Sequence, residues 1–177
     1  MNRIPYHEFI LHGSPVPDPT DESLEGKTIS TSYGYFCDKK AILFGLPGAF
    51  TPTCTNEMLP TYDILFDKFK KEFGIDAIYC TSVNDDYVME AWAKSLEIKN
   101  VEMIPDGNAS FAKAMNMCIR MEHMGFGLRS WRYSAYVDDG EIVLMLPEDG
   151  MENNLALDEY DISSPEYMYE QLKKLSL

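Results

Sequence analysis

Two segments of different periodicity meet at Gly45-Leu46-Pro47-Gly48-Ala49-Phe50-Thr51-Pro52-Thr53-Cys54. The apolar run at residues 39–46 predicts a buried strand. Over residues 54–72 the apolar positions recur at helical spacing instead, which predicts a helix. Cys54 is therefore expected in the first turn of a helix, where free amide N–H groups and the helix dipole favour a thiolate over a thiol. A buried structural cysteine is the alternative interpretation.

The predicted strand and helix are the first two parts of a βαβ unit. Residues Ile75–Cys80 form a second apolar run, so the two strands are expected to be parallel and joined by a right-handed crossover. Pro60 lies inside the predicted helix and indicates a kink or a fresh start there. Residues 82–85 then offer a helix N-cap, and the helix that follows is expected to bury Trp92.

The second half of the chain alternates between short elements. We expect a strand at Val101–Ile104, a turn at residues 105–108 and a short helix carrying residues 111–115. Residues 118–130 have no clear periodicity, which is typical of a loop near a site or an interface. Residues 131–137 and 142–146 are expected to pair as antiparallel strands across the turn at Asp138-Asp139-Gly140.

The two ends of the chain carry weaker signals. Residues 15–19 are expected to form an extended arm, and residues 27–36 a hairpin at a sheet edge. His7 and His12 lie in this region and are interpreted as isolated surface histidines. At the other end, a capping box at residues 163–166 predicts a closing helix. That helix is expected to turn three side chains towards the core: Met168, Leu172 and Leu175.

Length and composition limit the function classes. A chain of 177 residues fits one domain spanning residues 1–177. Its net charge of −14 argues against binding to nucleic acid or to anionic membranes. No apolar run approaches the ~20 residues of a membrane span, and the first residues lack the apolar core of a secretory signal.

The cysteine spacing narrows the chemistry further. Cys37, Cys54, Cys80 and Cys118 are widely separated and form no C-x-x-C pair. This spacing argues against a disulfide framework and against a zinc site, so no metal or cofactor is expected. A reducing, cytoplasmic setting follows.

Arg132 is the second residue of interest. It lies inside a predicted strand between aromatic residues, a position that is costly for a charge unless the charge is paired. Two interpretations remain open: an edge-strand charge in solvent, or a cation directed into a site.

The spacing of three residues resembles a known active site. Pro47, Thr51 and Cys54 fit the pattern P-x-x-x-T-x-x-C, and Arg132 follows later on a strand. Together they resemble the peroxiredoxins, and most closely the type II (peroxiredoxin-five) subfamily with its bacterial forms fused to glutaredoxin. The resemblance is carried by four stretches in the family's order: residues 44–54, 82–85, 104–107 and 129–134. It implies an α/β thioredoxin-like fold with a central mixed sheet flanked by helices.

The same resemblance implies a role for each matching residue. Cys54 would be the peroxidatic cysteine, which attacks a peroxide and becomes a sulfenic acid. Thr51 would hydrogen-bond the thiolate or the peroxide, and Pro47 would shape and shield the pocket. Arg132 would favour the thiolate and stabilise charge on the departing oxygen. The expected activity is a thiol-dependent peroxidase acting on hydrogen peroxide and alkyl hydroperoxides.

The thiol that restores Cys54 is a separate question. Cys80 resembles the second cysteine of plant-type members, 26 residues after Cys54, but its predicted place at the end of a central strand favours a buried, inert thiol. We therefore expect an external thiol, glutathione with glutaredoxin first and thioredoxin second. The resemblance also implies a homodimer joined near the active-site loops.

Other functions fit the sequence less well. A thiol–disulfide oxidoreductase on the same fold would normally need C-x-x-C. A non-enzymatic redox sensor or relay would share Cys54 without rapid turnover. A Cys–His hydrolase with His123 as base would leave Arg132 unexplained.

Overall fold

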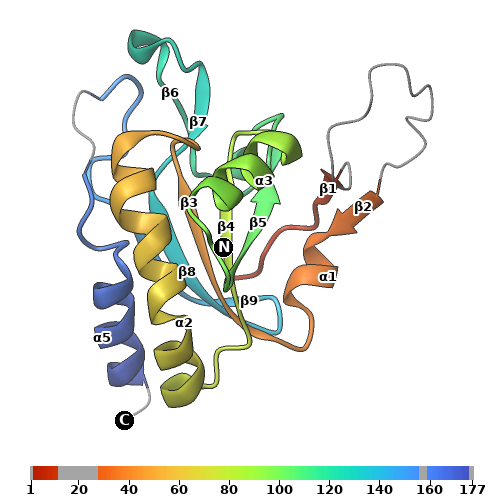
Figure 1. Ribbon diagram of the computed structural model, residues 1–177, viewed down its shortest axis with the longest axis vertical. Helices are drawn as coiled ribbons and strands as arrows, with labels where there is room; N and C mark the ends of the chain where they lie inside the picture. Colours follow the sequence, from red (N-terminus) through yellow and green to blue (C-terminus); the bar gives the residue numbers. More distant parts are fainter. Residues whose placement is uncertain (1, 12–27, 156–158, 176–177) are drawn as a thin grey trace.

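The computed structural model describes residues 2–11, 28–155 and 159–175, and its centre is a five-stranded mixed sheet (Figure 1). The strand order is β5-β4-β3-β8-β9. Strands β3, β4 and β5 are parallel, whereas β8 runs antiparallel to both β3 and β9. The bounds are β3 Lys40–Leu46, β4 Ala77–Ser82, β5 Val101–Pro105, β8 Tyr133–Asp138 and β9 Glu141–Pro147. This is the expected α/β architecture.

Helices cover both faces of the sheet. Figure 1 shows α2 (Leu59–Phe73) and α5 (Pro165–Leu175) side by side on one face, with α3 (Asp86–Ser95) also drawn in front of the sheet. Buried residues of all three helices form one core cluster with Ile42 and Phe44 of β3. The opposite face packs against α1 (Ser32–Phe36), α4 (Ser110–Ala114) and β1 (Glu8–Leu11). Because both faces of β3 are covered, its sequence is almost continuously apolar.

The predicted restart at Pro60 is confirmed as a change of helix type. A short π-helix, Cys54–Met58, precedes α2, and the Leu59 amide donates to the Cys54 carbonyl five residues back. Pro60 stands at the start of α2, where its missing N–H costs least. A π-turn of this kind often marks a functional site.

The prediction of a hairpin within residues 27–36 is wrong for the second strand, which is a short helix. Strand β2 (Thr28–Thr31) pairs with β1, and Ser32–Phe36 then forms α1. Thr31 caps that helix, because its hydroxyl accepts from the Gly34 amide at 3.1 Å. The extended arm expected at residues 15–19 and His12 lie outside the described residues.

Residues 118–130 contain a hairpin where the sequence indicated only a loop. Strands β6 (Cys118–Arg120) and β7 (Leu128–Ser130) pair antiparallel, with a 3₁₀ turn at Glu122–Met124 between them. We call residues 118–130 the β6–β7 arm. Figure 1 shows this arm projecting beyond the end of the sheet.

The closing helix starts where expected but is capped differently. The hydroxyl of Ser164 accepts from the Tyr167 amide, whereas the Ser163 hydroxyl donates to Glu148. Met168 and Leu172 face the core as predicted. Leu175, however, is 55% exposed, so its expected place in the core is wrong.

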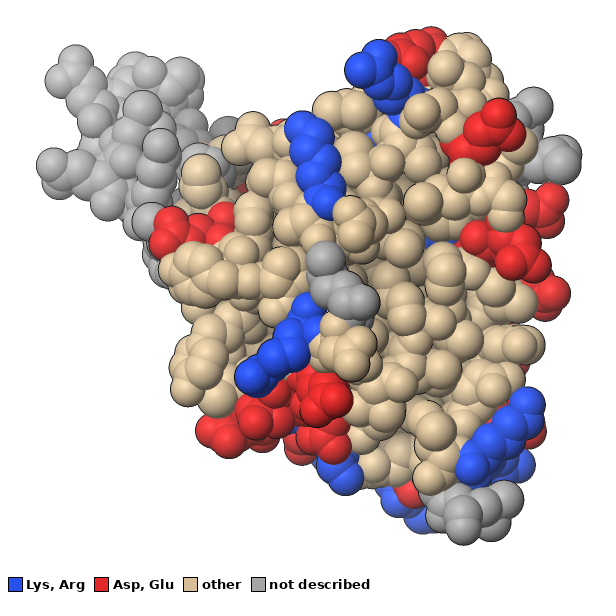
Figure 2. All heavy atoms as spheres, turned by 180° about the vertical axis from the view of Figure 1, so that it is seen from behind, with Lys and Arg blue, Asp and Glu red and all other residues tan. Residues whose placement is uncertain are grey.

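Among the described residues, the surface shows no concentration of basic side chains on the face seen in Figure 2. On the face seen in Figure 2, basic side chains of the described residues are scattered, and acidic ones gather towards the edges. Among the helices of the described ranges, none is both long and apolar enough to cross a bilayer.

Candidate active site

The loop between β3 and the π-helix places Cys54 at the start of a helix. The Thr51 carbonyl accepts from the Thr55 amide at 2.9 Å, so Cys54 lies in the first helical turn. The loop is closed by the Thr51 hydroxyl, which donates to the Gly48 carbonyl at 2.8 Å. Phe50 adopts a left-handed conformation with φ of 62°. A non-glycine residue held at such a φ is typical of functional loops.

Two neighbours hold this loop in place. The Ala49 amide donates to Asn84 Oδ1 at 3.0 Å, which ties the loop to the end of β4. Trp92 of α3 is buried, and its indole N–H donates to the Thr55 hydroxyl at 3.1 Å. The 82–85 stretch and the predicted core tryptophan therefore both position the turn that carries Cys54.

Arg132 is a buried cation directed at Cys54. It lies immediately before β8 rather than inside it, and β8 is an interior strand, so the edge-strand interpretation is wrong. The side chain is 2% exposed. Its Nη1 lies 3.4 Å from Cys54 Sγ and 3.5 Å from Met58 Sδ. A buried guanidinium at this distance favours the charged thiolate over the thiol.

Tyr160 and Glu148 support Arg132, and no pattern in the sequence predicts a role for either residue. The ring of Tyr160 lies 5.6 Å from the Arg132 guanidinium carbon, a cation–π distance. The buried Glu148 carboxylate accepts from the amides of Asp161 and Ser163, which fixes the segment that carries Tyr160. The Glu148 amide also donates to the Arg132 carbonyl, so Glu148 contacts both the backbone of Arg132 and the segment that carries Tyr160.

Pro47 and Thr51 flank the same region. Pro47 and Arg132 line a narrow cavity of about 10 Å³, room for about one water molecule. The Thr51 hydroxyl proton is used on Gly48 and not on Cys54, so the expected donation from Thr51 to the thiolate is absent among the described contacts. The Thr51 oxygen keeps its capacity to accept a hydrogen bond.

Cys80 is buried inside the sheet. It pairs with Phe44 of β3 and Met103 of β5, and β4 continues past it to Ser82. Cys54 and Cys80 belong to the same core cluster. Burial raises the pKa of the Cys80 thiol well above its ordinary value, and the charge of Cys54 raises it further. Both effects keep Cys80 protonated and unreactive.

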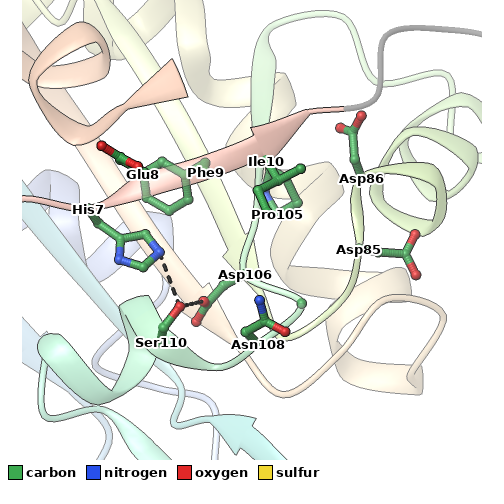
Figure 3. Close-up of a pocket in the computed structure, with 11 residues that line it drawn as sticks. His7, Glu8, Phe9, Ile10, Asp85, Asp86, Pro105, Asp106, Asn108 and Ser110 are labelled. Atoms are coloured by element: carbon green, nitrogen blue, oxygen red, sulfur yellow. Dashed lines mark hydrogen bonds between the residues drawn. The ribbon is translucent and has the colours of Figure 1, made fainter. Parts of the chain in front are cut away.

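A larger cavity lies on the other face of the sheet. Figure 3 shows His7, Ser110 and Asp106 in its wall, with the His7 Nε2 and Ser110 Oγ atoms 3.2 Å apart. Asp106 accepts from the amides of Phe111 and Ala112 in the first turn of α4, and also from the Ser110 hydroxyl at 3.4 Å. The cavity of about 300 Å³ contains neither Cys54 nor Arg132 in its lining.

His123 does not form a hydrolase pair with Cys54. The residue is exposed on the β6–β7 arm, and its Nδ1 lies 3.1 Å from Asn154 Oδ1. The Cys54 thiol contacts the Arg132 guanidinium instead. An arginine cannot act as the general base that such a hydrolase needs.

Comparison with known proteins identifies the family. A family model described as Redoxin matches residues 11–158. A peroxiredoxin of Rhizobium etli is 46% identical over 158 residues, which cover 86% of this chain and 88% of the relative. The chain belongs to the peroxiredoxin family. Peroxiredoxins are thiol-dependent peroxidases, and this chain is such an enzyme.

Two further relatives place this peroxiredoxin more closely. The hybrid peroxiredoxin hyPrx5 of Haemophilus influenzae is 40% identical over 92% of this chain and 66% of its own length. The crystal structure of a Plasmodium falciparum antioxidant protein, a 1-Cys peroxiredoxin, superposes with a TM-score of 0.86 at 37% identity and covers 98% of each chain. The resemblance to peroxiredoxin-five and hybrid forms is confirmed.

Proposed function

We propose that this peroxiredoxin reduces hydrogen peroxide and small alkyl hydroperoxides at Cys54, and that an external thiol restores the enzyme. The observation that carries this proposal is the buried Arg132 guanidinium 3.4 Å from the Cys54 sulfur. In a water-poor site, a fixed cation and the amides of a first helical turn favour the thiolate before peroxide arrives. They also stabilise negative charge where it develops during the reaction.

The proposed reaction has two stages. The Cys54 thiolate attacks one peroxide oxygen, so that an S–O bond forms as the O–O bond breaks. The departing oxygen takes up a proton and leaves as water or an alcohol, and Cys54 becomes a sulfenic acid. A reducing thiol then attacks that sulfur and releases water, leaving a mixed disulfide. A second thiol attacks the mixed disulfide and returns Cys54 to the thiolate.

Thr51 and Pro47 have supporting roles in this proposal. Because the Thr51 hydroxyl proton is engaged by Gly48, its oxygen is available to accept from the peroxide O–H. Such a bond would orient the peroxide rather than stabilise the thiolate. Pro47 lies beside Arg132 in the wall of a narrow cavity, and we assign it the role of shaping the pocket around that guanidinium.

An external reductant fits the position of Cys80. Cys80 is buried in a strand paired on both sides, and its raised pKa keeps it a thiol, which makes it a poor nucleophile towards an oxidised Cys54. We therefore propose glutathione with glutaredoxin as the first reductant and thioredoxin as the second, as the likeness to glutaredoxin-fused forms implies. The name of the Plasmodium relative, a 1-Cys peroxiredoxin, supports a mechanism with one reacting cysteine.

The proposal extends to assembly and location. Large apolar side chains are exposed at Phe50 in the active-site loop and at Met124 and Leu128 on the β6–β7 arm. These residues support a homodimer joined near the active-site loops. All four cysteines are free thiols, which supports a reducing, cytoplasmic location.

Peroxide consumption by the wild type and by Cys54→Ser tests the proposal. We expect turnover with glutathione and glutaredoxin in the wild type and none in the variant. A redox relay would instead be oxidised once and turn over only with a protein partner. Mass spectrometry after one equivalent of peroxide tests the reductant. A Cys54–Cys80 disulfide in most molecules would overturn resolution by an external thiol.

A further inference from the structure

Arg129 is a second guanidinium at the active-site loop, and the reaction described above does not use it. It lies in β7, and its side chain is half-buried. Its Nη1 donates to the Pro47 carbonyl at 3.3 Å, and its Nε donates to the Phe126 carbonyl at 3.1 Å. One planar group therefore bridges the loop before Cys54 and the β6–β7 arm, two segments far apart in sequence.

The chain leaves room for this bridge on both sides. A Cβ atom on Gly48 would lie 2.8 Å from Arg129 Nη1, so glycine at position 48 allows the guanidinium to approach the loop. On the arm, the Phe126 ring lies 5.0 Å from the guanidinium carbon. A guanidinium donates in two directions from a rigid fork and packs on an aromatic face, and an ammonium cannot do both.

The bridge also brings a positive charge towards Cys54. Partial burial lowers the pKa of Arg129, and the charge of Cys54 opposes that shift. Among the described residues, the Arg132 guanidinium contacts Cys54, and Arg129 and Cys80 also interact with its charge. Cys80 is protonated by burial, so the two arginines add their positive charge to the potential that the first-turn amides create at the sulfur.

We propose that Arg129 is a positioning residue for peroxide reduction, which fixes the Pro47–Gly48 peptide beside Cys54 and adds a second cation to the thiolate site. This inference rests on the proposed function of Cys54. The positioning effect of Arg129 acts through Pro47. Arg129 holds the Pro47 carbonyl, and Pro47 lines a cavity together with Arg132. The electrostatic part of the inference acts directly on the sulfur.

Three variants separate these parts. Arg129→Gln removes the charge and the fork, and Arg129→Lys keeps the charge but loses the fork. Arg120→Gln is the matched control, because Arg120 lies in β6 of the same arm and makes an exposed ion pair with Glu122. Each variant is made with and without Cys54→Ser, so that the ultraviolet absorbance of the Cys54 thiolate is obtained by difference across the pH range.

For Arg129→Gln we expect the thiolate titration to move to higher pH, because one cation is lost, and kcat/KM for peroxide to fall roughly tenfold. Arg129→Lys keeps the charge, so its thiolate titration should lie closer to the wild type than that of Arg129→Gln, and its kcat/KM should be intermediate. Arg120→Gln should match the wild type in both measurements.

The inference is overturned if Arg129→Gln titrates and reacts like the wild type. It is also overturned if the loss of rate only follows a loss of folded protein, measured by circular dichroism, with the titration unchanged. An equal titration shift in Arg129→Lys and Arg129→Gln would contradict the electrostatic part. If the wild type itself consumed no peroxide, the proposed function would fail, while the titrations would still test Arg129.

Discussion

Arg132 Nη1 lies 3.4 Å from Cys54 Sγ, although 78 residues separate them in the chain. The contact exists because β8 lies next to β3 in the sheet, antiparallel to it, so the start of β8 meets the end of β3. Cys54 follows that end of β3 by a short loop, and Arg132 precedes β8 by one residue. The central sheet therefore brings a cation and a nucleophile together where β3 ends and β8 begins.

The ring of Tyr160 is expected to hold this cation in place. Removing the ring in Tyr160→Leu should lower kcat/KM for peroxide about two- to fivefold, the size of a cation–π contact. Tyr160→Phe keeps the ring and should stay near the wild-type value. Steady-state kinetics of both variants provide the check, and equal losses in the two would show that the hydroxyl group matters instead.

Gly45 is expected to be intolerant of a side chain. A Cβ atom there would lie 2.2 Å from Tyr133 Cε1, inside a fully buried part of the sheet. Gly45→Ala should lower the free energy of unfolding by about 1–3 kcal/mol, measured by urea denaturation. The control is Gly34→Ala in α1, where the nearest atom would be 3.7 Å away and stability should stay the same or rise. Unchanged stability in Gly45→Ala would contradict the packing described.

Cys80 should make the protein less stable in alkaline solution. Its pKa is raised in the folded state, so above the ordinary thiol pKa of about 8.5 the unfolded chain loses the proton while the folded chain keeps it. The stabilisation is complete below that pH and is lost as pH rises towards the folded pKa, by up to about 1.4 kcal/mol per pH unit.

Urea denaturation of the wild type and Cys80→Ala, at roughly pH 7.5 and pH 9.5, measures this effect. The alanine variant has no group to titrate at this position, so its stability should fall less over the interval. Its turnover with an external thiol should persist, because Cys80 takes no part in the proposed cycle. An equal alkaline loss in both proteins would assign the effect to other residues.

The βαβ unit and the β8–β9 hairpin followed from the sequence because local patterns specify them. Continuous apolar runs, helical spacing around Tyr62 and the Asp139-Gly140 turn are local signals. Helix α1 was mistaken for a strand because Tyr33, Tyr35 and Phe36 favour strands, whereas the Thr31 cap and burial of Phe36 decide the outcome.

The candidate site was predicted in part for the same reason. The spacing from Pro47 to Cys54 is local and readable. The partners of Arg132 cannot be predicted in this way. Tyr160 lies in a segment without periodicity, and hydrogen bonds to Glu148 hold that segment beside Arg132. The bridge from Arg129 to Pro47 likewise depends on a hairpin that the sequence did not reveal.

Arg132 itself should dominate the rate of peroxide reduction. Arg132→Gln removes the cation at the sulfur and should lower kcat/KM about 10²–10³-fold, the cost of losing a fixed donor at a site of developing charge. Arg132→Lys keeps the charge without the planar geometry and should lie between. Stopped-flow measurement of peroxide reduction, with thermal unfolding as the control for folding, checks both. A near-normal rate in the glutamine variant would remove Arg132 from the active site.

The most direct measurement is the pH titration of the Cys54 thiolate by its ultraviolet absorbance, in the wild type and in folded Arg132→Gln, each corrected with the matching Cys54→Ser protein. We predict that the titration of the variant lies at higher pH than that of the wild type, because the guanidinium 3.4 Å from the sulfur no longer favours its charged form. Identical titrations in the two folded proteins would contradict the electropositive site on which the proposed peroxidase chemistry depends.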